Sequence, residues 1–155
     1  MSKRKITTQN KTNKRIKDQK SYDIFNAKLK LLYAARSGDA KSLKNILNSG
    51  LFDYNLLTGH SNSNILHISV EEEHFNCIEE ILKKKDFLIH ELNHDNESAL
   101  DIVIKKIKLA DTKINSHGKF IRYLRFAFII VKFIIDNTDE YDLEEYEKDY
   151  KNIYK

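Results

Sequence analysis

Apolar residues recur along the chain in three groups with helical spacing. The anchors Leu31, Leu66 and Leu100 lie 35 and 34 residues apart. In the first two groups a second apolar set follows 12 residues after the anchor, at Leu43, Ile46 and Leu47 and at Ile78, Ile81 and Leu82. Positions i, i+3 and i+4 share one helical face. The pattern predicts repeated pairs of short helices and therefore an all-α fold.

The third group is longer than the other two. Its second apolar set begins at Val131, which is 31 residues after Leu100. This spacing predicts an insertion near residues 107–120. Residues 119–137 then read as one long helix that is apolar around most of its circumference, so we expect neighbouring helices to bury it.

Charge divides the chain into three parts. Residues 1–20 carry eight basic residues against Asp18, and residues 136–155 carry eight acidic residues against three lysines. We predict a disordered basic tail at 1–21, because it has too few apolar residues to offset its ordering entropy. A repeat domain is predicted at 22–137. An acidic, tyrosine-rich tail, partly ordered at best, follows at 138–155.

Composition narrows the class of protein. The chain has 155 residues, no proline, four glycines and one cysteine, Cys77. Scarce turn residues argue against a β-sandwich, and a single cysteine excludes an internal disulfide. The N-terminus has no apolar signal segment, and no apolar run is long enough to span a membrane easily. We therefore expect an intracellular protein, in the cytoplasm or nucleus, without a membrane role.

Catalytic and metal motifs are missing from the sequence. Histidines at 90 and 94, and His74 three residues before Cys77, do not form the paired spacings of a zinc site. There is no nucleophile elbow and no phosphate-binding glycine loop. Cys77 falls at a packed helical position, where a thiol is inert. We expect no metal, no cofactor and no enzymatic activity.

The three segments resemble the ankyrin repeat. Residues 65–69 (ILHIS) keep Leu66 and His67 of the family signature, residues 31–39 (LLYAARSGD) keep Ala34, Ala35 and Gly38, and residues 98–103 and 130–135 are similar to the helices of a third unit. The implied units are 27–58, 59–92 and 93–137. The Thr-Pro opening is absent, and Glu73 replaces the turn glycine. The resemblance implies a structural role for His67, which ties the turn by hydrogen bonding, and for His74.

Protein recognition is the function that the ankyrin resemblance implies. The surface would comprise the loops 53–63 and 86–96 and the ends of the first helices. Its candidate residues are Arg36, Ser37, Asp53, Tyr54, His60, Asn62, Glu71, Glu72, His94 and Asn96. The expected partner is another protein bound by a monomeric chain. The high content of Lys, Ile and Asn indicates an AT-rich genome, which would suit an intracellular bacterium or a virus. With such a source, the partner would be a host protein in the host cytoplasm.

A second interpretation places the function in the basic tail. Two clusters lie there, Lys3, Arg4 and Lys5 followed by Lys14, Arg15 and Lys17. Such clusters are compatible with a nuclear-import signal or with contacts to nucleic-acid phosphates. No aromatic residue is interleaved with them, so base stacking is not supported. Nucleic acid is therefore the less favoured partner, with the repeat body as a scaffold.

Overall fold

The computed structural model describes residues 3–112 and 117–137. Within these residues the chain forms helices and no strand, which confirms the all-α class. The elements are α1 Lys3–Ser37, α2 Ala40–Leu47, α3 Ile65–Glu71, α4 Phe75–Leu82, α5 Ala99–Asp111 and α6 His117–Asn137, with short 3-10 turns η1 Tyr54–Leu56 and η2 His60–Asn62.

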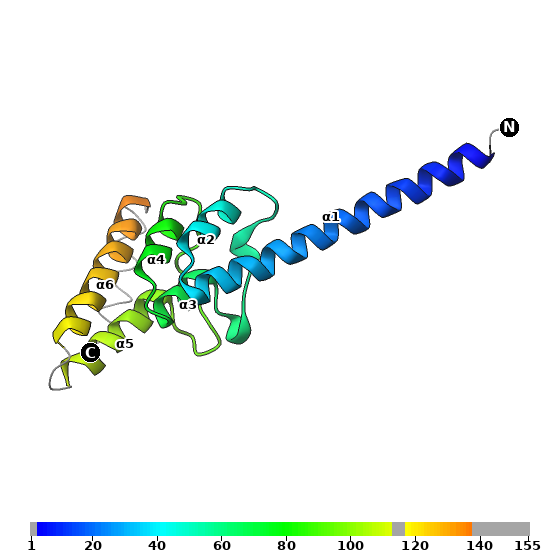
Figure 1. Ribbon diagram of the computed structural model, residues 1–155. Helices are drawn as coiled ribbons and strands as arrows, with labels where there is room; N and C mark the ends of the chain where they lie inside the picture. The colour runs from blue at the N-terminus through cyan, green and yellow to red at the C-terminus, as the bar shows by residue number, and fades with distance from the viewer. Residues whose placement is uncertain (1–2, 113–116, 138–155) are drawn as a thin grey trace.

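The helices pack as three consecutive pairs. Helix α1 packs on α2, α3 on α4, and α5 on α6 (Figure 1). Neighbouring pairs then contact in two layers, with α1, α3 and α5 in one layer and α2, α4 and α6 in the other. Residues 59–92 and 93–137 each span one pair, whereas residues 27–58 span α2 and only the last part of α1.

Side-chain caps begin most of these short helices. The Asp39 carboxylate accepts the Ser42 N–H at 3.0 Å at the start of α2. The Asn64 side chain accepts the N–H groups of Leu66 and His67 at the start of α3. Ser98 and Asp101 form a reciprocal capping box on α5. Caps of this kind satisfy N–H groups that would otherwise lack partners, which matters most for helices of seven or eight residues.

The core runs along the interface between the two layers. The predicted anchors Leu31, Leu43, Leu66 and Ile78 are fully buried. In the third unit Leu100 is half-buried and packs against the core, Val131 is exposed, and Ala99, Val103 and Ile130 are buried. The longer helices of this unit change which residues face the core.

The predicted insertion near 107–120 contributes mainly to longer helices. Helix α5 continues to Asp111 and α6 begins at His117, so the connection is residues 112–116. Helix α6 has 21 residues and α5 has 13, compared with eight in α2 and in α4. The predicted long helix at 119–137 is confirmed.

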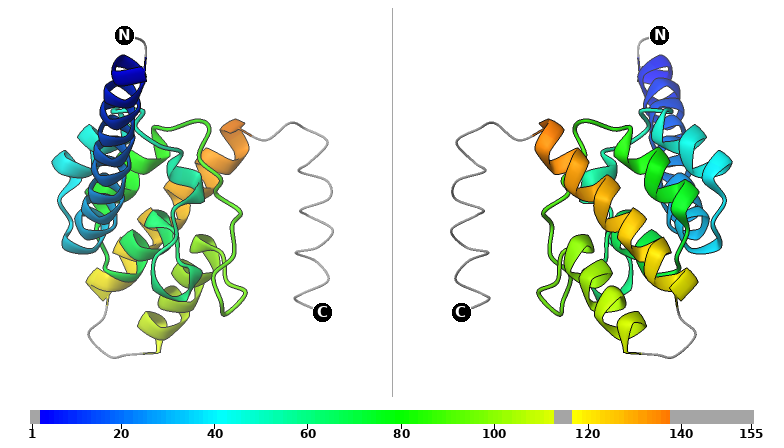
Figure 2. Two further views of the ribbon diagram at one scale, coloured as in Figure 1. Left: turned by 90° about the vertical axis from the view of Figure 1, so that its right-hand side faces the viewer. Right: turned by 90° about the vertical axis from the view of Figure 1, so that its left-hand side faces the viewer.

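The N-terminal segment differs from the disorder predicted for residues 1–21. Helix α1 begins at Lys3, and its first part projects away from the body (Figures 1 and 2). Disorder was predicted because this segment has few apolar residues to bury. Once the packed end of α1 provides a helical nucleus, extension adds one hydrogen bond per residue and needs no burial. The segment contains no glycine or proline to stop it.

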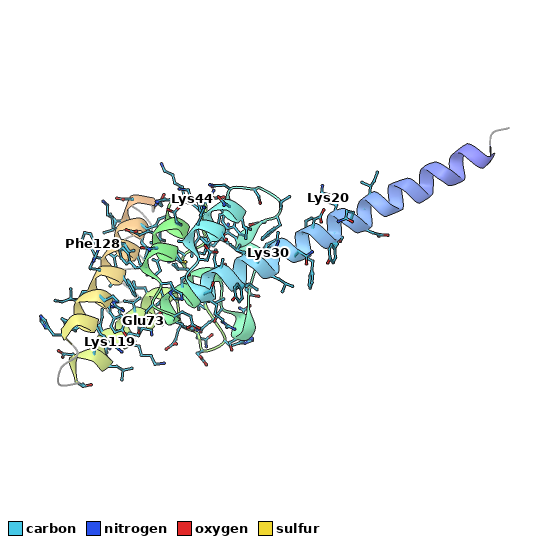
Figure 3. All side chains as sticks on the ribbon, in the orientation of Figure 1. Lys20, Lys30, Lys44, Glu73, Lys119 and Phe128 are labelled. Atoms are coloured by element: carbon cyan, nitrogen blue, oxygen red, sulfur yellow. The ribbon has the colours of Figure 1, made fainter. Side chains whose placement is uncertain are left out.

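Burial of α6 around most of its circumference is a wrong prediction. One side, with Tyr123, Phe126 and Ile130, is buried, whereas Phe128 is 68% exposed (Figure 3). Helix α6 is the last helix that the structure describes, so α4 and α5 cover only one of its sides. Among the described helices none is long and apolar enough to cross a membrane.

Candidate protein-binding surface

The loops that precede α3 and α5 lie side by side. The Asn55 side chain joins them, since its Nδ2 donates to the Asp86 carbonyl at 2.9 Å and its Oδ1 accepts the Leu88 N–H at 3.0 Å. Tyr54 donates its hydroxyl to the Asp86 carboxylate and stacks on Phe87 at 6.2 Å between ring centroids. Burial and this hydrogen bond raise the pKa of Tyr54, so it remains a donor at neutral pH.

A second contact joins the same loops nearer their ends. The Asn62 Nδ2 donates to the Leu92 carbonyl at 3.3 Å, and the His94 backbone N–H donates to the Ser61 carbonyl at 3.0 Å. The imidazole of His94 stays exposed. The two loops therefore form one continuous edge of the molecule.

The predicted loop residues divide by role. Asp53 caps η1 by accepting the Asn55 N–H at 3.0 Å, and Tyr54 and Asn62 bridge the loops. Asn96 occupies a turn with φ of 57° and donates its N–H to the Asn93 carbonyl at 3.1 Å. Asp53, Asn62 and Asn96 are exposed and so present polar groups as well as these structural contacts. The side chain of His60 lies outside the described part of the structure.

The predicted helix-end residues also meet. Arg36, near the end of α1, lies 3.8 Å from the Glu72 carboxylate, which follows α3. Ser37 and Glu71 lie beside them in the sequence, and all four residues are exposed. An exposed pair of this kind contributes little to stability because solvent screens it. These groups remain available to a partner.

Histidines at 67 and 74 hold turns together. The His67 Nδ1 lies 3.2 Å from the Asn64 backbone nitrogen and 2.7 Å from the Asn64 Oδ1, and its Nε2 lies 3.1 Å from the Glu97 carbonyl oxygen, so the ring links two loops. Burial lowers the pKa of His67. The His74 Nε2–H donates to the Arg36 carbonyl at 2.9 Å. Within the described residues, no group of three or more histidine, cysteine or acidic side chains could hold a metal ion.

A charged cluster around Glu73 was not predicted from the sequence. Its carboxylate accepts the Tyr123 hydroxyl at 2.6 Å and lies 3.4 Å from Arg122 and 3.6 Å from Lys106. Burial alone would raise the pKa of Glu73, but the Tyr123 hydrogen bond and the nearby cations together lower it. Glu73 has φ of 63°, the conformation that favours glycine. The one feature of the sequence that could have indicated this cluster was the replacement of the turn glycine by Glu73.

Cys77, the remaining titratable side chain of the core, is unreactive. Its thiol is fully buried, and Sγ lies 3.8 Å from the Ala34 carbonyl. Burial raises the pKa of Cys77 to about 11. A thiol in this state carries almost no thiolate at neutral pH.

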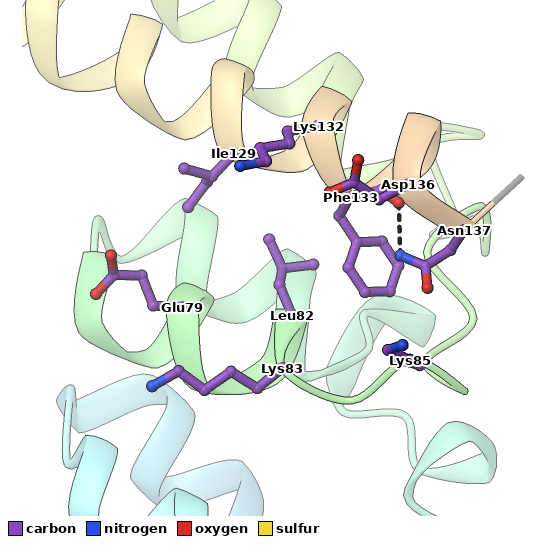
Figure 4. A pocket seen from close by; sticks show the side chains of 9 residues that line it. All are labelled: Glu79, Leu82, Lys83, Lys85, Ile129, Lys132, Phe133, Asp136 and Asn137. Carbon is purple, nitrogen blue, oxygen red and sulfur yellow. Dashed lines mark hydrogen bonds between the residues drawn. The ribbon is translucent and has the colours of Figure 1, made fainter.

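A groove of about 560 Å³ lies between α4 and the C-terminal half of α6 (Figure 4). Leu82, Ile129 and Phe133 form its apolar part. Lys83, Lys85 and Lys132 provide positive charge around it, with Glu79, Asp136 and Asn137 completing the lining. The sequence did not predict this groove, because it depends on how two helices 50 residues apart converge.

The basic residues predicted as an alternative site occupy the projecting part of α1. Lys3, Arg4, Lys5, Lys14, Arg15 and Lys17 all fall within Lys3–Ser37. They lie far along the helix from the loop edge (Figure 1). The structure therefore separates the two predicted sites. The chain matches no family model, and no curated protein resembles it closely enough to be counted as a relative.

Proposed function

We propose that the chain is a short array of three ankyrin-type repeats that recognises another protein without catalysis. The observation that carries this proposal is the joined loop edge. Asn55 and Tyr54 hold the two loops together, and exposed polar side chains project beside them. Binding residues held by rigid hydrogen-bonded loops lose less entropy on complex formation.

The helix packing supports the ankyrin assignment. Consecutive pairs in two layers are the arrangement expected of stacked repeats, in which each unit contacts only its neighbours. The left-handed residues Gly38 and Glu73 occur at equivalent turns, between the two helices of the first pair and between those of the second.

Affinity capture with a substituted surface tests the proposal. The variant Glu71→Ala/Glu72→Ala/His94→Ala removes exposed side chains from the loop edge and the adjoining helix end. The matched control Lys41→Ala/Asn45→Ala/Asn76→Ala removes three exposed side chains from α2 and α4. Circular dichroism first establishes that both variants fold like the unmodified chain.

We expect the surface variant to lose most of the captured protein, measured by quantitative mass spectrometry, and the control to keep it. Equal capture by both variants would place the binding surface elsewhere.

The projecting part of α1 provides a second candidate function. It extends a basic helix away from the body, where it can contact an acidic receptor or a phosphate backbone (Figure 1). Replacing Lys3, Arg4, Lys5, Lys14, Arg15 and Lys17 by glutamine should abolish such binding. Binding through these residues should also fall steeply as salt rises, whereas recognition by the loop edge should not.

A further inference from the structure

The outer side of α6 carries a continuous stripe of exposed apolar side chains. They recur at alternating spacings of three and four residues, as Ile121, Leu124, Phe128, Val131 and Ile135, and are 38–68% exposed. This period is that of a coiled-coil seam. Repeat arrays need a polar outer face at their ends, so an apolar stripe there calls for a covering element.

Charge beside the stripe restricts what can cover it. Arg125 and Lys132 each follow a stripe residue directly and lie along the same side of it, and both are exposed. In an antiparallel pair of α6 helices from two copies, these positions would face each other and place like charges together. The stripe therefore fits an acidic amphipathic helix better than a second copy of the chain.

The sequence that follows α6 has the required pattern. Apolar and aromatic residues recur there at spacings of three, four and three, as Leu143, Tyr146, Tyr150 and Ile153. Residues 138–155 also contain seven acidic residues. In a helix, the three lysines Lys148, Lys151 and Lys155 would fall on the side opposite this apolar stripe.

We propose that residues 143–154 form a helix that packs antiparallel on the stripe of α6 and covers its apolar side chains. The register that a short connection allows sets Ile135 near Leu143, Val131 near Tyr146, Phe128 near Tyr150 and Leu124 near Ile153. Steps of four, three and four residues on α6 then meet steps of three, four and three on the segment, so each pair lies within one residue of exact alignment. The two matched segments are both about 16 Å long as helices. Residues 138–142 form the connection, and five residues suit an antiparallel helix pair.

The same register pairs opposite charges. Lys132 and Glu147 each follow a seam residue, Val131 and Tyr146 respectively, and in an antiparallel pair these flanking positions face each other. The basic side of α6 thus meets the acidic side of the covering helix. The segment predicted from sequence as an acidic tail lies outside the described residues, and its role here is this proposal.

Disulfide trapping in the full chain tests the register. The variant Val131→Cys/Tyr146→Cys should form an intramolecular disulfide under mild oxidation. The matched control Val131→Cys/Lys148→Cys places the second cysteine on the opposite side of the proposed helix. Cys77 can stay, because its buried thiol is unreactive. We expect the first variant to close at least tenfold faster than the control.

Two results would overturn the proposal. Equal closure rates would mean that the segment has no preferred side toward α6. Disulfide-linked dimers, with a yield that grows with protein concentration, would mean that a second copy covers the stripe.

Amide exchange provides an independent measurement on the chain without added cysteines. We expect residues 143–154 to be protected, and Phe128→Asp to remove this protection while Phe128→Leu keeps it. Phe128 is exposed in the described structure, so neither variant disturbs the core. Unprotected amides at 143–154 in the unmodified chain would also refute the proposal.

Discussion

His67 couples the pH to the stability of the fold. In the folded chain its ring is buried, both ring nitrogens have hydrogen-bond partners, and burial lowers its pKa. In the unfolded chain it takes up a proton as the pH falls through about 6.5. The unfolded state then binds more protons than the folded state. The contribution of His67 to the free energy of unfolding is therefore fully present above that pH and is lost as the pH falls below it.

Urea unfolding at pH 7.0, 6.0 and 5.5 measures this effect. We expect the free energy of unfolding to fall by up to about 1.4 kcal/mol per pH unit below pH 6.5. His67→Gln should lower the stability at pH 7 and flatten this dependence. His94→Gln changes an exposed ring and should leave the slope in place. A slope that survives in His67→Gln would assign the effect to other groups.

At Glu73 an unfavourable backbone conformation is offset by favourable side-chain contacts. Its φ of 63° is costly for any residue except glycine, while its carboxylate binds Tyr123, Arg122 and Lys106. Glu73→Ala loses the carboxylate and keeps the strain. Glu73→Gly loses the carboxylate but relieves the strain, which is worth about 1 kcal/mol.

Chemical denaturation of the two variants separates these contributions. Both should be less stable than the unmodified chain, because the Tyr123 hydroxyl loses a charged acceptor worth about 1.5–3 kcal/mol. Glu73→Gly should be the more stable of the two by about 1 kcal/mol. Equal stabilities would mean that the left-handed conformation carries no strain here.

At the scale of the element, α6 owes its partial exposure to its position. The same sequence in the middle of a stack would be covered on both sides, and its two apolar faces would both be core. The exposed face is the basis of the proposed covering helix. The proposed pair of Lys132 and Glu147 beside this face can be tested separately.

Reversing the sign of one charge should weaken the proposed pairing, and reversing both should restore it. Lys132→Glu places a carboxylate against Glu147, which should cost about 0.5–1 kcal/mol of docking. The amide protection of residues 143–154 would fall by the corresponding factor. The double variant Lys132→Glu/Glu147→Lys should recover it at low salt. No recovery would show that the two residues do not face each other.

At the scale of the whole molecule, we expect the contacts between the pairs to make all three pairs unfold together. Ile78 is fully buried in the middle pair, and both outer pairs pack on that pair. Removing one methylene by Ile78→Val should cost about 1 kcal/mol. Since no unit buries its core alone, the loss should be felt in all three pairs.

Native-state amide exchange resolves this prediction by segment. We expect the most protected amides of the α1–α2, α3–α4 and α5–α6 pairs to lose similar free energies of opening in Ile78→Val. The surface variant Asn76→Ala lies two residues away and is exposed, so it should leave the outer pairs unchanged. A loss confined to α3 and α4 would mean that the pairs unfold independently.

The sequence alone determined the all-α class, the helix pairs and most of the core. Leu31, Leu43, Leu66 and Ile78 were predicted from spacing and are fully buried. Local periodicity can reveal these features because each one depends on residues within a turn or two of one another. The predicted loop residues were found on one edge, but their pairing through Asn55 was not foreseen.

Tertiary structure decided everything that depends on distant segments. The Glu73 cluster joins residues 50 positions apart, and the groove beside Lys132 depends on how α4 and α6 converge. Which side of α6 is buried depends on how many neighbours the stack supplies, and the helical state of residues 3–21 depends on a nucleus packed further along α1. Periodicity shows that a helix has an apolar face but not whether another element covers that face.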